Sequence, residues 1–185
     1  MRTFIAIDLD EEIKKNLNQF IKKLDKGNPS IKWVKKNGMH LTLKFLGNVS
    51  PEKVTSIQSS LNKAAQEFSS FSLNLKGTGS FPPGKKIPRV LWVGIEEKEP
   101  VQSLQARIEE EMEKLHFPKE KRKFHSHLTL GRIKKKSNLD FVLREFHQYE
   151  EADFGKMKVE KLTFFQSTLK PSGAEYTVLS VHPLK

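Results

Sequence analysis

Apolar residues along the chain follow two periods, one typical of strands and the other of helices. Residues 4–9 form a short apolar run that predicts a strand, and Asp10 then opens a helix that ends before Gly27. Apolar positions recur three or four residues apart along that helix: Ile13, Leu17, Phe20, Ile21 and Leu24. The chain therefore begins with a strand followed by an amphipathic helix.

The same two periods predict the elements of the remaining chain. Further helices are predicted to begin at Ser50, Pro100 and Leu139, and the Gly-, Pro- and Lys-rich residues 77–88 predict an exposed loop. Residues 170–173, Lys-Pro-Ser-Gly, predict the turn between the last two strands. The predicted strands span residues 31–34, 39–46, 71–75, 89–96, 124–133, 159–169 and 176–181.

The order strand, helix, strand occurs twice with the same spacing. His40 follows Phe4 by 36 positions, and His127 follows Leu91 by 36 positions. The tetrapeptide His-Leu-Thr-Leu begins at both histidines. A repeated unit of this kind predicts two lobes related by an approximate twofold axis, which would bring the two histidines together across a cleft.

Each His-Leu-Thr-Leu segment presents its polar residues on one face of a strand. Because side chains alternate along a strand, His40 shares a face with Thr42, and His127 shares a face with Thr129, while the leucines anchor the other face. Imidazole has an ordinary pKa of about 6.5, so one ring can act as a base and the other, if protonated, as an acid. The threonine hydroxyls are candidates for binding phosphate oxygens. The four residues together suit the cleavage of a cyclic phosphodiester.

Each copy of the motif also has a structural explanation. One histidine beside a threonine on a strand is more often a hydrogen-bonded surface pair than a catalyst. The identical tetrapeptide at corresponding positions of a repeat is hard to attribute to packing, because packing would repeat the apolar pattern and not the polar residues. The pair therefore indicates catalysis.

Length, charge and composition narrow the class of protein. The chain of 185 residues fits one compact domain, residues 1–185, with the internal repeat at about 3–47 and 90–134. The formal charge of +11 favours polyanions such as nucleic acid, although a lysine-rich solvated surface explains it equally well. The lack of cysteine excludes disulfides, thiolate metal sites and a cysteine nucleophile.

The amino-terminal apolar stretch is too short for a signal peptide or a membrane span, because acidic residues follow it at once. We therefore expect a cytoplasmic protein without membrane association. We also expect a monomer.

With these motifs the sequence resembles the two-histidine phosphoesterases, specifically the bacterial and archaeal RNA 2′,3′-cyclic phosphodiesterases, also called 2′-5′ RNA ligases. The resemblance covers nearly the whole chain and is carried by two copies of the His-x-Thr-x motif together with their surroundings. The matching segments are residues 4–7, 39–47, 89–94, 127–132 and 167–179.

The resemblance implies a fold, a reaction and roles for the histidines. The implied fold is α+β, with two pseudo-symmetric lobes around a central cleft, each an antiparallel sheet with helices on its outside. The implied reaction converts a 2′,3′-cyclic phosphate at an RNA end to a 2′-phosphomonoester without a metal or another cofactor. His40 would be the proton donor to the leaving 3′ oxygen, and His127 would be the proton acceptor from water. Which of the two histidines is the acid and which is the base stays open. Joining RNA ends through a 2′-5′ linkage would be the reverse activity.

Lys44 and Arg132 are further candidates for substrate binding. Lys44 is predicted on the same strand face as His40, where it could contact phosphate, although a lysine in so basic a chain is more often solvated. Arg132 falls on the face opposite His127 if its strand is regular, so a role in phosphate binding requires a bulge. A structural salt bridge is an equally good interpretation of Arg132.

Other side chains suggest two further kinds of binding site, one for a metal ion and one for a nucleic-acid base. His125 with His40 and His127 could form a three-histidine zinc site, but the repeat has Gly38 at the position that matches His125. Four aromatic residues on the predicted strands could stack on a terminal base, although most of them are expected in the core: Trp33, Phe45, Trp92 and Phe124.

Two alternatives to RNA-end hydrolysis concern the function itself. One is a noncatalytic RNA-binding module, and the other is a cyclic phosphodiesterase that acts on small nucleotides.

Overall fold

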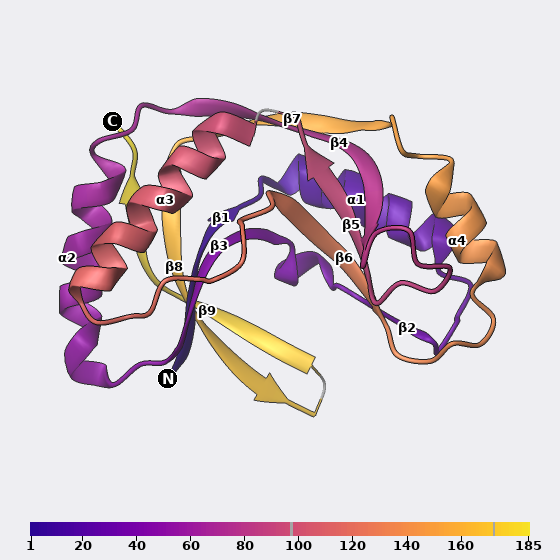
Figure 1. Ribbon diagram of the computed structural model, residues 1–185, viewed down its shortest axis with the longest axis horizontal. Helices are drawn as coiled ribbons and strands as arrows, with labels where there is room; N and C mark the ends of the chain where they lie inside the picture. The colour runs from indigo at the N-terminus through magenta and orange to yellow at the C-terminus, as the bar shows by residue number, and fades with distance from the viewer. Residues whose placement is uncertain (97, 172) are drawn as a thin grey trace.

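Two antiparallel sheets organise the chain in the computed structural model, which describes residues 1–96, 98–171 and 173–185 (Figure 1). Sheet A has the strand order β3-β1-β8-β9, and sheet B has the order β2-β6-β5-β4-β7. The strands of sheet A are β1 (Arg2–Asp8), β3 (His40–Asn48), β8 (Lys161–Lys170) and β9 (Gly173–Pro183). The strands of sheet B are β2 (Ile31–Trp33), β4 (Phe71–Phe81), β5 (Val90–Ile95), β6 (His127–Ile133) and β7 (Asp153–Val159).

Helices cover both sheets, and two of them cross from one sheet to the other. α1 (Glu11–Leu24) follows β1 of sheet A but packs on β7 of sheet B, whereas α3 (Lys98–Lys114) follows β5 of sheet B and contacts β3 of sheet A. α2 (Val54–Ala65) packs on β8 and β9, and α4 (Asp140–His147) packs on β4 (Figure 1). Short 3-10 helices span Lys36–Gly38 and Pro51–Lys53. The two lobes are therefore joined by exchanged helices.

The start of α1 shows how local sequence sets an element. The Asp10 carboxylate accepts a hydrogen bond of 2.8 Å from the backbone N–H of Ile13, which satisfies one of the unpaired amides of the first turn. The apolar stripe of the helix then meets the core of sheet B, where Phe20 lies 4.9 Å from Phe154 between ring centroids. The predicted amphipathic helix is confirmed.

The strands that carry the two histidines meet where the sheets adjoin. Cα atoms of β3 lie within 8 Å of Cα atoms of β6, although the two strands belong to different sheets. The backbone N–H of Val34, directly after β2, donates a hydrogen bond of 2.8 Å to the carbonyl of Leu130 and so extends the pairing of β2 with β6 in the segment that leads to β3. We call this region the sheet junction.

The predicted α+β fold with two antiparallel lobes is confirmed, with four corrections to its elements. Residues 77–81, predicted as loop, continue strand β4, and strand β7 was not predicted. The first error arose from Gly79, whose missing side chain makes room for the indole of Trp92 on the neighbouring strand. α3 begins at Lys98, two residues before Pro100, and β6 begins at His127, three residues after the predicted start at Phe124. Ser172 of the predicted last turn lies outside the described residues.

Among the described residues, no helix has both the length and the apolar character needed to cross a membrane.

Candidate active site

A β-bulge interrupts each of the two His-Leu-Thr-Leu strands at the same place. Along β3, Thr42 pairs with Ala6 while Lys44 pairs with Ile5, so that Leu43 is the extra residue. Along β6, Thr129 pairs with Trp92 while Gly131 pairs with Leu91, so that Leu130 is the extra residue. The repeat therefore extends to a backbone irregularity, which is a feature common beside active sites.

The bulge of β3 turns Lys44 away from His40. Lys44 lies on the core side of the strand, with a side chain only 4% exposed, and its ammonium is 2.5 Å from a carboxylate oxygen of Glu109. The same ammonium donates to the carbonyl of Pro118 at 2.9 Å. The prediction that Lys44 shares a face with His40 is wrong, because the extra residue at the bulge reverses the alternation of side chains. Lys44 is part of the core.

The bulge of β6 has the opposite effect on Arg132. The reversed alternation places Arg132 on the face of Thr129 and His127, where its side chain is exposed, and its charge is among the influences that lower the pKa of His127. The bulge that Arg132 needs in order to contact phosphate is therefore present in β6. Phe45 holds the corresponding position in β3 and is 68% exposed, so it is outside the core. Phe45 was one of four possible stacking residues in the sequence, and comparing the two copies beyond the tetrapeptide distinguishes it from the others, because Phe45 and Arg132 each lie five residues after a motif histidine.

His40 lies half-buried against aromatic rings from three strands of sheet A. Its ring centroid is 4.6 Å from that of Phe4, 5.1 Å from Tyr176 and 5.7 Å from Phe165. Burial among these rings lowers the pKa of His40 to about 4, because it disfavours the charged imidazolium. The carboxylate of Asp8, which faces His40 across the β1–β3 pair, opposes the decrease.

His127 has a defined hydrogen bond that orients its ring. Nδ1 lies 2.7 Å from the backbone carbonyl of His125, and since a carbonyl can only accept, Nδ1 carries the proton. Burial lowers the pKa of His127, and the hydrogen bond to His125 only partly opposes this decrease. Near neutral pH the ring is therefore neutral, with Nε2 able to accept a proton.

Thr42 and Thr129 lie two residues beyond the histidines and before the bulges. Each is half-buried and lies on the same strand face as its histidine. The structure thus places the two polar pairs on the neighbouring strands of the sheet junction.

A cavity of about 290 Å³ borders His127 on sheet B, and we call it the His127 pocket. Aromatic side chains of β4 and β5 form part of its wall, and Phe81 meets the His127 ring edge-on at a centroid distance of 5.0 Å. Gln102 of α3 also lines the pocket, and so does Ser126, which directly precedes β6. His40 is not among its lining residues.

The zinc site considered from the sequence has no matching ligand set here. Within residues 1–96, 98–171 and 173–185, no three His, Cys, Asp or Glu side chains form a group that could hold a metal ion. His125 interacts with His127 through its backbone carbonyl, and its own ring lies 6.2 Å from that of Phe81.

Comparison with known proteins finds matches along the whole chain. A family model described as LigT like phosphoesterase matches twice, at residues 7–92 and 93–176. An RNA 2′,3′-cyclic phosphodiesterase of Thermotoga maritima is 38% identical over 97% of this chain and 93% of its own length. One of Archaeoglobus fulgidus is 36% identical over 98% and 99%.

Solved structures share the fold. A crystal structure from Thermus thermophilus superposes with a TM-score of 0.79 at 29% identity, covering 100% of this chain and 98% of that one. Escherichia coli LigT complexed with 3′-AMP has a TM-score of 0.80 at 24% identity, covering 99% and 97%.

Proposed function

Since this chain belongs to the LigT like phosphoesterase family, we propose that it hydrolyses 2′,3′-cyclic phosphate ends of RNA to 2′-phosphomonoesters through acid–base catalysis by His40 and His127. The observation that carries the proposal is the pair of identical His-Leu-Thr-Leu strands, each with the same bulge, that meet at the sheet junction. The relatives from T. maritima and A. fulgidus, which cover nearly the whole chain, support the choice of RNA as substrate.

His127 acts as the base that activates water. Its Nδ1 proton is held by the carbonyl of His125, so Nε2 takes the proton of the attacking water as the new oxygen–phosphorus bond forms. The lowered pKa of His127 keeps the free ring neutral and ready for this step near neutral pH.

His40 acts as the acid that protonates the departing 3′ oxygen. In the free protein its burial favours the neutral ring, but a bound phosphodiester brings a negative charge that favours the imidazolium. Substrate binding therefore supplies the acid form. The bond between phosphorus and the 3′ oxygen breaks, the proton passes to that oxygen, and the phosphate stays on the 2′ oxygen.

Neighbouring residues on the same faces hold the rest of the substrate. The hydroxyls of Thr42 and Thr129 donate to phosphate oxygens, and the guanidinium of Arg132 can offer two parallel hydrogen bonds as charge develops. Phe45 is an exposed aromatic ring on the His40 face, where it can stack on the terminal base.

The same acid and base support 2′-5′ ligation. If a 5′-hydroxyl takes the place of water, His127 accepts its proton, and the product is a 2′-5′ phosphodiester. Ligation is thus hydrolysis with a different nucleophile.

The test uses an oligoribonucleotide with a 2′,3′-cyclic phosphate end, incubated with the protein in EDTA, and separates the 2′- and 3′-phosphate products. We expect a 2′-phosphate from the wild type and a loss of at least 100-fold in rate, on the order of the effect of a general acid or base, in His40→Ala and His127→Ala. His147→Ala, an exposed histidine bonded to Glu150, is the matched control and should keep full activity. An unprocessed RNA end would contradict the proposal, and cleavage of 2′,3′-cyclic AMP alone would favour a small-nucleotide enzyme.

A further inference from the structure

We infer that Lys32 binds the phosphate that joins the last two nucleotides of the RNA, and that this contact makes the protein prefer oligonucleotides over cyclic mononucleotides. The inference rests on the proposed function, because it concerns the substrate of the same two histidines. Lys32 takes no part in the proton transfers and acts on specificity.

Lys32 lies on the face of sheet B that carries His127. β2, at the edge of the sheet beside β6, pairs Lys32 directly with Arg132 (Figure 1). Residues directly opposite each other on antiparallel strands point to the same face, with Cβ atoms about 4.5–5.5 Å apart. Arg132 is on the face of His127, so Lys32 is on that face too, one strand further out. The burial of its neighbour Ile31 in the core agrees with this orientation.

Lys32 and Arg132 are two exposed cations for which the described part of the chain has no acidic partner, because none of its ion pairs includes either side chain. Other exposed lysines have one, such as Lys158, whose ammonium is 2.8 Å from a carboxylate oxygen of Glu160. Like charges directly opposite each other on neighbouring strands destabilise the folded state. A bound anion would remove this repulsion, so the pair is suited to a ligand with negative charge.

The structure of an RNA end determines which phosphate Lys32 can reach. The cyclic phosphate bridges the 2′ and 3′ oxygens of the last ribose, and the next phosphate is attached to the 5′ oxygen of the same ribose. In the proposed mechanism Arg132 contacts the cyclic phosphate. Lys32 lies beside Arg132, and both side chains are long enough for their charges to lie one nucleotide apart. Lys32 is therefore placed for the phosphate on the 5′ oxygen.

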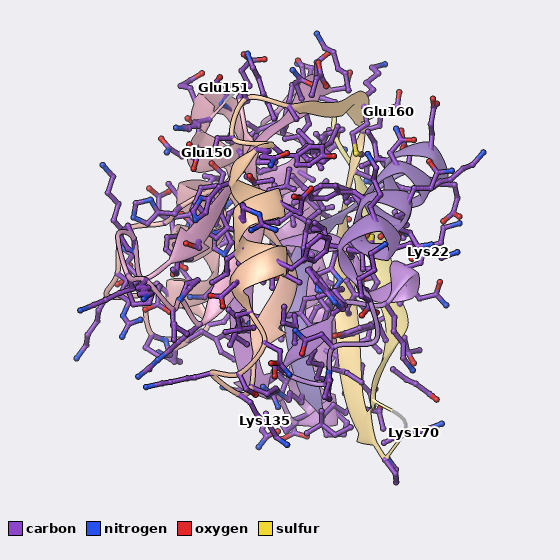
Figure 2. All side chains as sticks on the ribbon, turned by 90° about the vertical axis from the view of Figure 1, so that its right-hand side faces the viewer. Lys22, Lys135, Glu150, Glu151, Glu160 and Lys170 are labelled. Carbon is purple, nitrogen blue, oxygen red and sulfur yellow. The ribbon has the colours of Figure 1, made fainter. Side chains whose placement is uncertain are left out.

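The charge distribution of the molecule directs the rest of the RNA past Lys32. The lysine run at residues 134–136 follows β6 directly, and the backbone N–H of Lys134 donates a hydrogen bond of 2.6 Å to the carbonyl of Ser30, just before β2. Figure 2 shows Lys135 toward the opposite end of the molecule from Glu150 and Glu151. A polyanion is attracted to the basic end. A strand that leaves the histidines in this direction passes β2.

A cyclic mononucleotide cannot use this contact. 2′,3′-Cyclic AMP presents its cyclic phosphate to His40, His127 and Arg132, but its 5′ oxygen carries no phosphate. Lys32 therefore stabilises the complex with an oligonucleotide and leaves the complex with a mononucleotide unchanged. The preference for oligonucleotides thus arises outside the reacting group.

The experiment compares three substrates with the same reacting end. One is 2′,3′-cyclic AMP, and the second is a dinucleotide in which a deoxyadenosine precedes adenosine 2′,3′-cyclic phosphate. The third is the same dinucleotide with an uncharged methylphosphonate in place of the linking phosphate. The constant kcat/KM for hydrolysis is measured for each. The wild type should favour the charged dinucleotide over the uncharged one by about fivefold, because the methylphosphonate removes a charge-assisted contact.

Substitutions of Lys32 test whether this preference comes from its ammonium. Lys32→Ala should lower kcat/KM for the charged dinucleotide about fivefold and leave the other two substrates within about twofold of the wild type. Lys32→Arg keeps the charge and should keep the preference. Because the three substrates are compared within each variant, the fraction of folded molecules does not affect the preference.

The matched control is Lys22→Ala. Lys22 is exposed near the end of α1, which packs on the core side of sheet B, so this variant removes the same charge away from the histidines. It should leave the preference for the charged dinucleotide unchanged.

The dependence of binding on salt gives a second measure of the same contact. Each phosphate that a cation neutralises contributes about 0.7 to the slope of log affinity against log salt for a single strand. Binding is measured with the inactive His127→Ala variant, with and without Lys32→Ala. The second substitution should reduce the slope for the charged dinucleotide by roughly 0.7 and leave the slope for 2′,3′-cyclic AMP unchanged.

Three results would overturn the inference while hydrolysis stands. One is a wild type with equal kcat/KM for the charged and the uncharged dinucleotide. Another is a Lys32→Ala variant that loses activity equally on all three substrates, which would place Lys32 at the reacting phosphate. The third is an equal loss of preference in Lys22→Ala, which would attribute the effect to net charge. If none of the three substrates is hydrolysed, or only 2′,3′-cyclic AMP, the proposed function itself is wrong.

Discussion

The ammonium of Lys44 lies 2.5 Å from the carboxylate of Glu109, on the core side of β3 and away from the face that carries His40. Both side chains are nearly inaccessible to water, so the pair joins sheet A to α3 through a buried ion pair. A buried charge without its partner is strongly unfavourable. The interaction therefore concerns stability rather than substrate.

Lys44→Met should destabilise the protein while leaving substrate binding intact. Removing one partner of a buried ion pair costs about 3–5 kcal/mol, which chemical denaturation would detect as a lower midpoint. The double variant Lys44→Met/Glu109→Leu should recover much of the loss, because it leaves no unpaired charge. If the single variant has normal stability and a raised KM, Lys44 contacts substrate and the assignment to the core is wrong.

Arg132→Ala should slow hydrolysis about 100-fold, because removal of a positioned donor to developing charge has effects on the order of 10²–10³ in kcat. Arg132→Lys keeps the charge but loses the planar pair of donors, so it should recover only part of the rate. Steady-state kinetics on cyclic-ended RNA would measure both. Lys135→Ala, on the same basic segment, is the control, and its effect should be a modest loss of affinity that disappears at high salt.

The pH dependence should differ between the free protein and its complex. Catalysis requires His40 protonated and His127 neutral, and burial lowers both pKa values in the free protein. The profile of kcat/KM, which reports the free protein, should therefore be a bell with its maximum below pH 6.5. The phosphate charge raises both pKa values in the complex, so the kcat profile should shift to higher pH. A kcat/KM maximum above pH 7 would contradict this assignment.

His125→Ala should change the hydrolysis rate by less than about fivefold, because His127 is oriented by the backbone carbonyl of residue 125 and not by its imidazole. EDTA should leave the rate of the wild type unchanged. His127→Ala is the comparison that loses activity. A large loss in His125→Ala, together with inhibition by EDTA and rescue by zinc, would support a metal site instead.

Phe45→Ala should weaken the action on RNA ends without loss of stability. Stacking of a base on an aromatic ring contributes about 1–3 kcal/mol, so we expect kcat/KM to fall by roughly tenfold. The residue is 68% exposed, which limits the effect on unfolding. Leu169→Ala, at another exposed apolar position, is the control and should change neither kcat/KM nor the stability to unfolding.

Local patterns determined the elements and the central residues of the site. The alternation of side chains on a strand places His40 with Thr42 and His127 with Thr129, and this holds because both pairs precede the bulges. The start of α1 at Asp10 could be predicted for the same reason, since capping involves groups three residues apart.

Only the tertiary structure decided which side chains accompany those four. The bulges at Leu43 and Leu130 move Lys44 into the core and bring Arg132 to the face of His127, and a bulge depends on the partner strand's register. The passage of α1 onto sheet B and of α3 onto sheet A likewise depends on contacts between distant residues. Such contacts leave no period in the sequence, because they are set by how the two sheets pack.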